Sequence, residues 1–128
     1  MEEREKFLKD FRGTYLGELS AETSEDEYFQ NQTLRPILKL QNNLLIAVCR
    51  KHIYKYNKDF STFSTDKKQK VVENMLQKDE KFRKLLIGII IGLFTENEIE
   101  TYLKNTSNLN KRIISMLTER FLSQLQVL

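Results

Sequence analysis

The sequence predicts an all-α protein, a single-domain bundle of five or six helices over residues 1–128. Apolar residues recur at helical spacing through most of the chain, and Ser, Thr or Asp precede the apolar runs where helix caps belong. Only four Gly and one Pro interrupt the pattern, and almost no segment has the pattern of a β-strand with a second strand to pair with. With 128 residues, 40% of them hydrophobic, the chain can bury one core without disulfides or a structural metal.

The N-terminal part of the chain is expected to be peripheral. A short helix can begin at Glu2 and reach residue 11 or 12, where Gly13 ends it. Residues 14–23 are less periodic and are expected to form a linker, packed through Tyr15, Leu16 and Leu19. Residues 1–23 are therefore interpreted as a peripheral segment of the single domain.

The longest helical pattern begins at a capping box, Ser24-x-x-Glu27. There Ser24 accepts a hydrogen bond from a first-turn amide and Glu27 reaches back. The pattern runs to about Tyr56, but Pro36 removes an amide donor and pushes Arg35 away from helical angles. We therefore expect the helix to be kinked or broken near Pro36.

The 37–56 helix carries apolar side chains on two sides. A helix of this kind is either central in a bundle or covered by a second subunit. His52 falls in the middle of the main apolar face, which favours a satisfied core or boundary histidine over a catalytic or metal-binding one. Ile46 and Ile53 lie on the other side, among basic residues. The main face comprises Leu34, Ile37, Leu38, Leu44, Leu45, Val48 and Cys49.

The remaining elements follow from their caps. Residues 57–65 are expected to form a loop in which Phe60 and Phe63 fold back as plugs. Ser64 or Thr65 can then cap a helix that runs to about Gln77.

Three further helices complete the prediction. Asp79 caps a helix over 80–93 that is apolar nearly all round and is expected to be the most buried element. Thr95-x-x-Glu98 repeats the capping-box form and begins a short helix to about residue 105. Ser107 is expected to open the final helix.

The composition also limits the compartment and the chemistry. A single Cys cannot form an intrachain disulfide, so a reducing, cytoplasmic location is expected. The start Met1–Glu5 is unlike a signal peptide. The longest apolar stretch, residues 85–94, is much shorter than the about 20 residues that span a membrane. We expect no membrane association.

Enzymatic function is disfavoured. The chain holds no phosphate-binding glycine loop, no Cys-x-x-Cys pair and no His-Glu-x-x-His helix. Cys49 and His52 are three residues apart on one helix, but both face the predicted core, where a thiol is inert. We expect no catalytic residue, no metal and no cofactor.

The formal charge of +3 hides an asymmetry. Residues 1–30 hold nine acids and four bases, a net charge of −5, whereas residues 31–128 hold nine acids and seventeen bases, a net charge of +8. Residues 31–57 contain five bases and no acid. Such a basic body can attract nucleic acid or another anionic partner, or the acidic N-terminal segment can fold back on it.

The candidate binding residues are the bases of the 35–58 helix together with one arginine of the last helix. Arg35, Lys39 and Arg50 share one side of the helix, and Lys51 belongs to a second basic cluster. Arg120 lies inside the apolar arc of the final helix, where a charge must pair, snorkel or meet a ligand. A salt bridge to an acid of the N-terminal region, or a subunit interface, is the first expectation for Arg120, and a ligand anchor is the second.

Residues 31–39, residues 78–95 and residues 108–112, Asn-Leu-Asn-Lys-Arg, carry a resemblance to a known family. These segments are similar to those of a family of small uncharacterised proteins of Bacteroidetes-type bacteria, some of which are labelled glyoxalase. The resemblance implies a bacterial, cytosolic protein. It transfers no activity, because true glyoxalase I is a β-rich metalloenzyme whose metal is held by His and Glu, and this chain has one His and no evident strand.

The apolar faces, the basic helix and the missing catalytic motifs leave three candidate functions. The first is a non-enzymatic protein-interaction module that forms a homodimer or binds a protein partner through its two-sided apolar helices. The second is binding of nucleic acid or another anionic partner through the basic 35–58 helix. The third, a small-metabolite enzyme, is disfavoured.

Overall fold

The computed structural model describes residues 2–12 and 24–128, and all of its regular structure is helical, as predicted. Residues 25–56 are helical without interruption, so the described chain contains six separate helical rods. No described helix combines the length and the apolar character needed to cross a membrane. The α-helices are α1 (Glu2–Arg12), α2 (Glu25–Phe29), α3 (Arg35–Tyr56), α4 (Thr65–Lys78), α5 (Glu80–Ile91), α6 (Glu96–Lys104) and α7 (Thr106–Leu122).

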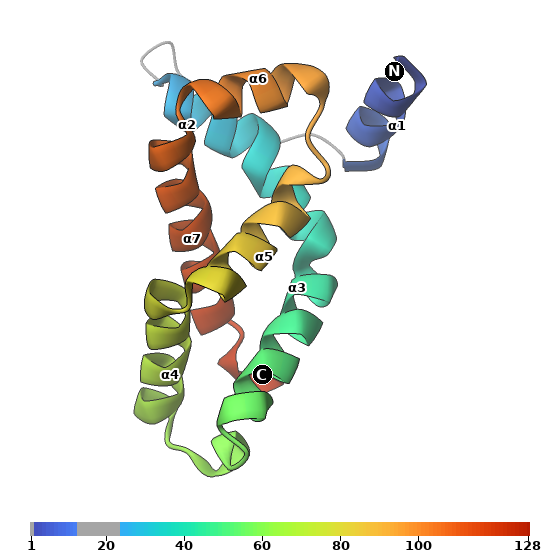
Figure 1. Cartoon of the computed structure of the whole chain (residues 1–128). Coiled ribbons are helices and arrows are strands. Elements are labelled where there is room, and N and C mark those ends of the chain that lie inside the picture. Colours follow the sequence, from blue (N-terminus) through green and yellow to red (C-terminus); the bar gives the residue numbers. More distant parts are fainter. Residues whose placement is uncertain (1, 13–23) are drawn as a thin grey trace.

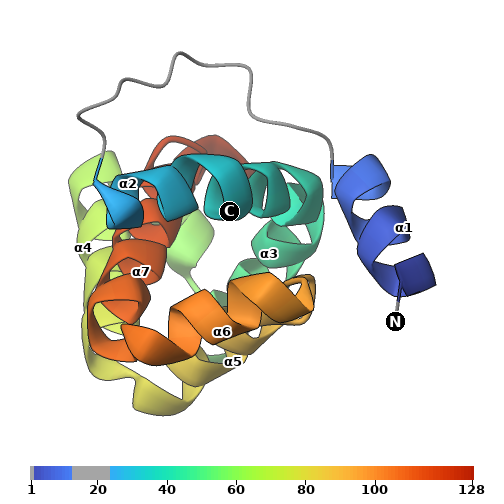
Figure 2. The ribbon, with the colours of Figure 1, turned by 90° about the horizontal axis from the view of Figure 1, so that it is seen from above.

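The helices of the bundle differ in direction. α3, α4 and α7 run along the length of the molecule, α5 crosses them obliquely, and α2 and α6 lie across one end (Figure 1). Seen from that end, α1 stands to one side of the bundle (Figure 2). α5 contacts α3, α4 and α7 and so connects the long helices to one another.

Side-chain caps begin α4, α5 and α6 as the sequence predicts. Ser64 and Asp79 accept hydrogen bonds from the backbone N–H groups of Lys67 and Phe82, which begins α4 and α5. Thr95 and Glu98 form a complete capping box at α6.

Two details at the remaining helix starts differ from the prediction. Ser24 accepts from the Glu27 N–H, but the described residues contain no hydrogen bond from the Ser24 backbone N–H to the Glu27 carboxylate. The final helix begins at Thr106, before the expected Ser107.

Of the two outcomes expected near Pro36, the structure shows the kink and not the break, because a π-helical turn over Gln30–Leu34 joins α2 to α3. The Arg35 N–H donates to the carbonyl of Gln30, five residues back, and Arg35 keeps helical angles of −60° and −47°. The wider turn shifts the carbonyls that a proline ring would otherwise meet. The rod stays continuous but turns from the end of the bundle into the long direction of α3 (Figure 1).

The core lies among the long helices. Cys49 and Phe60 are completely buried in it, so the expected Phe60 plug is confirmed, whereas Phe63 is half-buried. The expectation that α5 is the most buried helix is wrong. Leu85 is 52% exposed and Gly88 is exposed, because α5 packs on its neighbours through the face of Phe82, Leu86 and Ile90.

The N-terminal segment is described only in part. α1 lies at the edge of the molecule, and Leu8 is its one buried apolar side chain among residues 3–12. Phe7 and Phe11 stack on each other and stay exposed. The expected linker contacts of Tyr15, Leu16 and Leu19 lie outside the described residues.

Candidate functional site

The structure places the predicted basic residues on two different sides of α3. Arg35, Lys39 and Arg50 are exposed and share one side, because their spacings of four and eleven residues correspond to nearly whole helical turns. Lys51 is exposed too, but it follows Arg50 by roughly 100° around the helix axis and belongs to the opposite side from Arg35. The five predicted residues therefore do not form one site.

Arg120 of α7 lies near Arg35 and is a further cation on this side of α3. Its guanidinium Nη1 donates to Asn42 Oδ1 at 3.2 Å. Asn42 in turn exchanges two hydrogen bonds of 2.9 Å with Gln124, one in each direction between their side-chain amides. This amide pair fixes the end of α7 against α3 and turns an oxygen toward Arg120. We call Arg35, Lys39, Asn42 and Arg120 the cationic face.

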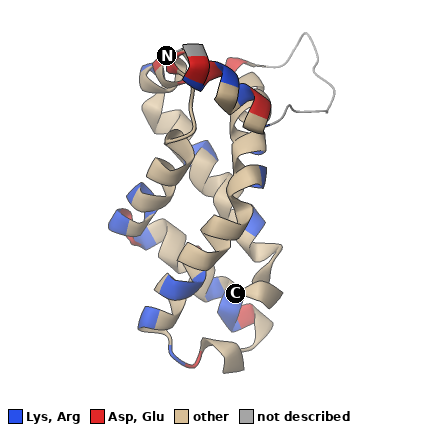
Figure 3. Cartoon of the chain, turned by 90° about the vertical axis from the view of Figure 1, so that its right-hand side faces the viewer, with Lys and Arg blue, Asp and Glu red and all other residues tan. Residues whose placement is uncertain are grey.

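The cationic face contains no acid. The ion pairs between described residues join Arg4 to Glu5, Arg12 to Glu98, His52 to Asp79 and Arg112 to Asp26, and none involves Arg35, Lys39, Arg50 or Arg120. Acidic positions gather around the N-terminal end of the molecule, while basic positions are spread along the rest of its length (Figure 3).

The electrostatic cost of this arrangement is visible at Arg120. Burial lowers the pKa of its guanidinium, and the charge of nearby Arg35 lowers it further. The side chain is half-buried, and the nearest stabilising group is the neutral amide of Asn42. Arg35 also has a neutral partner, because its Nε donates to Asn31 Oδ1 at 2.9 Å.

The salt bridge expected between Arg120 and an acid of the N-terminal region is therefore absent from the described residues. Asp26 instead accepts from Asn105 Nδ2 at 2.8 Å and lies 3.9 Å from Arg112. Glu18 and Glu22, which could fold back on the basic body, lie outside the described residues.

His52 is a boundary histidine, as predicted. Its Nε2 lies 2.8 Å from Asp79 Oδ2, and its ring stacks on Phe82 with centroids 3.9 Å apart. The hydrogen bond from the Phe82 N–H holds the pKa of Asp79 below its usual value against some desolvation, and His52 adds to this effect. His52 also lines a cavity of about 430 Å³ between α3 and α4.

Cys49 does not extend the His52 cluster into a catalytic pair. Its side chain is completely buried, and desolvation raises the pKa of the thiol to about 12. A thiol that stays protonated at neutral pH is a poor nucleophile.

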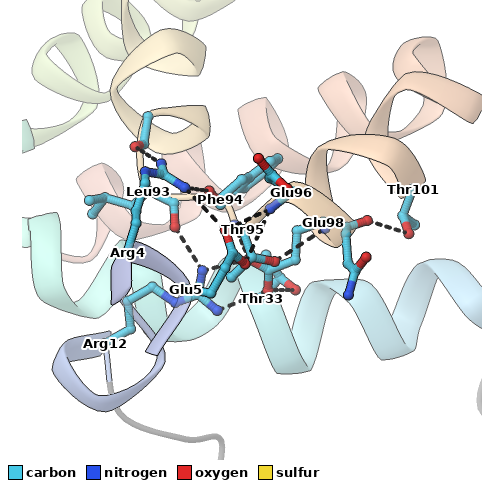
Figure 4. Close-up of polar contacts among 12 residues, drawn as sticks. Arg4, Glu5, Arg12, Thr33, Leu93, Phe94, Thr95, Glu96, Glu98 and Thr101 are labelled. Carbon is cyan, nitrogen blue, oxygen red and sulfur yellow. Dashed lines mark hydrogen bonds and ion pairs between the residues drawn. The ribbon is translucent and has the colours of Figure 1, made fainter. Parts of the chain in front are cut away.

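A second polar cluster, which sequence reasoning missed, lies where α1 meets the turn between α5 and α6 (Figure 4). Arg12 makes two hydrogen bonds of 2.6 and 2.8 Å with the Glu98 carboxylate and donates to the Leu93 carbonyl at 2.7 Å. Arg4 donates to the carbonyls of Phe94 at 2.9 Å and Gly92 at 3.2 Å.

α1 also contacts the other end of the turn, where α6 begins. The backbone N–H of Glu96 in the first turn of α6 donates to the Glu5 carboxylate, at 3.1 and 3.3 Å to its two oxygens. Cations of α1 thus meet carbonyls that follow α5, and an acid of α1 meets the start of α6, as the partial charges of helix ends favour. We call this arrangement the α1 docking cluster.

Glu98 is the centre of the α1 docking cluster. Burial raises the pKa of its carboxyl, but hydrogen bonds from Arg12, from the Thr95 N–H and from Thr33, together with the charge of Arg12, outweigh burial. The net effect is a pKa below the usual value, so Glu98 is an anion at neutral pH. A cavity of about 1060 Å³ adjoins the cluster and extends between α2 and α6.

Comparison with protein-family models, with curated proteins and with solved structures finds no match for this chain. The resemblance to the Bacteroidetes-type family therefore stays a prediction. Within residues 2–12 and 24–128, no group of three or more His, Cys, Asp or Glu side chains is placed to hold a metal ion.

Proposed function

We propose that the protein is a non-enzymatic helical binding module whose cationic face binds a polyanionic partner, with nucleic acid as the leading example. The observation that carries the proposal is Arg120, a half-buried arginine that stands next to Arg35 and has no carboxylate partner among the described residues. Burying a cation beside another cation costs free energy. A bound anion would remove much of this cost.

The groups of the cationic face suit an extended anion. Arg35 and Lys39 are one turn apart, so their side chains start about 6 Å apart along the α3 axis. Asn42 and Gln124 hold Arg120 beside this row without neutralising it. Arg50 continues the same side of α3 beyond Asn42. A row of cations at such spacings can follow successive phosphates or a run of carboxylates.

Fluorescence anisotropy with labelled 20-nucleotide single-stranded DNA, the matching duplex and a labelled polyglutamate tests this proposal. Arg35→Gln and Arg120→Gln each remove one charge from the cationic face, and we expect each to weaken binding of the preferred polyanion about tenfold at low salt. Lys51→Gln is the matched control, because it removes one charge from the opposite side of α3. Equal losses in all three variants, or no binding of any of these probes at 50 mM salt, would contradict the proposal.

A homodimer is a second proposal, supported by the exposed side of α5. Leu85 is 52% exposed, and a Cβ atom added at Gly88 would meet no atom within 4 Å. A second copy could approach closely at this point. Light scattering at micromolar concentration should then show a dimer that Leu85→Glu converts to a monomer. A wild-type monomer would rule this interface out.

A further inference from the structure

The turn between α5 and α6 gathers hydrogen-bond acceptors at one place. The carbonyls of Gly92, Leu93 and Phe94 and the carboxylate of Glu98 all accept from arginine side chains of α1. Carbonyls that follow a helix lack the intrahelical partners of the preceding residues. A planar guanidinium with five N–H donors satisfies several such acceptors at once, which an ammonium group cannot do in the same geometry.

The carboxylate in this group of acceptors is held by the body of the protein without help from α1. Thr33 Oγ1 donates to Glu98 Oε2 at 2.7 Å, and the Thr95 N–H donates to Glu98 Oε1 at 2.8 Å. Thr33 and Thr95 are both buried. The Glu98 carboxylate therefore has two donors in the body of the protein in addition to the arginine of α1.

The site does not satisfy every donor of Arg12. Its side chain is 4% exposed, yet Arg12 Nε has no hydrogen-bond partner among the described residues. A buried donor without a partner weakens the contact that buries it.

α1 as a whole is held mainly by this polar cluster. Leu8 is the buried apolar contact that the described part of α1 makes, whereas Phe7 and Phe11 remain 62% and 58% exposed. α1 thus resembles a bound ligand more than a core helix, and the adjoining cavity of about 1060 Å³ leaves space beside Arg12 and Glu98.

We propose that the turn between α5 and α6 is a guanidinium-binding site, that α1 is its intramolecular ligand, and that an arginine side chain of another polypeptide takes the same acceptors when α1 leaves. The chemical class of the ligand is an arginine presented by a peptide. The specificity-determining residue is Glu98, positioned by Thr33 and Thr95.

Chemical rescue tests the site itself. Arg12→Ala in the full chain frees the Glu98 carboxylate and the Leu93 carbonyl from their arginine. Ethylguanidinium is then titrated while NMR follows the backbone amides of Thr95 and Glu98. We expect saturable binding with a Kd on the order of millimolar, at least tenfold tighter than to the wild-type chain. Ethylammonium, the charge-matched probe, should bind at least tenfold more weakly. Adding Glu98→Gln to the Arg12→Ala variant should abolish binding.

A peptide experiment distinguishes the chain's own arginine from that of another polypeptide. A labelled peptide with the sequence of residues 2–12 is titrated into the full chain with Arg4→Ala and Arg12→Ala, and a peptide with both arginines replaced by lysine is the control. We expect the arginine peptide to bind at least tenfold more tightly to the double variant than to wild type, and the lysine peptide to bind at least tenfold more weakly.

Several results would overturn this proposal. Equal binding of ethylguanidinium and ethylammonium would show that the site does not select guanidinium. Unchanged binding after Glu98→Gln would show that Glu98 is not the acceptor that determines specificity. Rescue by ethylguanidinium without binding of the arginine peptide would show a purely intramolecular contact and contradict the second-polypeptide step. Circular dichroism checks that the variants fold. If Arg12→Ala does not fold, Arg12→Met serves as the second variant, because it keeps the apolar stem and leaves no cation on Glu98; the expected order of probes is the same.

Discussion

Replacing Arg120 by methionine should stabilise the protein, although it removes a hydrogen bond. The bond from Arg120 Nη1 to Asn42 Oδ1 is 3.2 Å long, and such a bond contributes about 0.5–1.5 kcal/mol. Asn42 Oδ1 keeps its 2.9 Å bond from Gln124, so the substitution leaves no orphaned acceptor. Methionine retains the apolar stem and removes a half-buried charge that Arg35 repels.

The expected net effect of Arg120→Met is a gain of about 0.5–1 kcal/mol in the free energy of unfolding, below the 1–4 kcal/mol found when fully buried ion pairs are replaced by apolar groups. For a chain of this length the gain corresponds to an increase of about 2–4 °C in Tm. Urea unfolding followed by circular dichroism measures it, with the m value checking that both variants unfold alike.

Arg112→Met is the matched control on the same helix. Arg112 donates to Gln30 Oε1 at 2.9 Å and lies near Asp26, so its removal should cost about 0.5–1 kcal/mol. If Arg120→Met destabilises the protein as much as Arg112→Met does, Arg120 is an ordinary structural cation and the reasoning about the cationic face fails.

Four further outcomes follow from the structure. Because the folded-state pKa of Glu98 lies below its usual value of 4.5, its contribution to stability is present above about pH 4.5 and is lost as the pH falls through the folded-state pKa; urea midpoints should therefore fall more steeply below pH 4.5 in wild type than in Glu98→Gln. Phe60→Ala should cost about 3–5 kcal/mol in urea unfolding, since Phe60 is completely buried, and a loss below 1 kcal/mol would mean that the loop does not anchor the core. Asp79→Ala removes the cap of α5 and should cost about 1 kcal/mol, which Asp79→Asn should largely restore. Cys49 should react with iodoacetamide at least about a hundredfold more slowly in the native protein than in urea, and comparable rates would contradict its burial.

The local structure was predictable because its causes are local. Ser64, Asp79 and Thr95 each precede a helical run, and each caps the amide that its spacing indicates. A kink near Pro36 was predictable from the sequence, but the π-helical turn that forms it was not. Sequence rules for proline describe an α-helix or its end, whereas the chain inserts a π turn and keeps the helix intact.

The two polar sites depend on residues far apart in the sequence. Arg120 lies 78 residues from Asn42, and Arg12 lies 86 residues from Glu98, so helical periodicity predicts neither contact. Periodicity did place Arg120 on the apolar side of α7. It could not decide between an acid, an amide and a ligand as its partner. The separation of Lys51 from Arg35 follows from helix geometry and could have been predicted.

The most direct test of the proposed function is the salt dependence of polyanion binding. Lys55 is exposed and lies one turn of α3 after Lys51, on the side away from Arg35. Plots of log Kd against log salt concentration for duplex DNA are compared among wild type, the double variant Arg35→Gln with Arg120→Gln, and the charge-matched double variant Lys51→Gln with Lys55→Gln. Each phosphate contact contributes about 0.9 to the slope, so the first double variant should lower its magnitude by nearly 2 and the second should leave it unchanged. Equal reductions in both double variants would show general attraction by net charge and would contradict a specific cationic face.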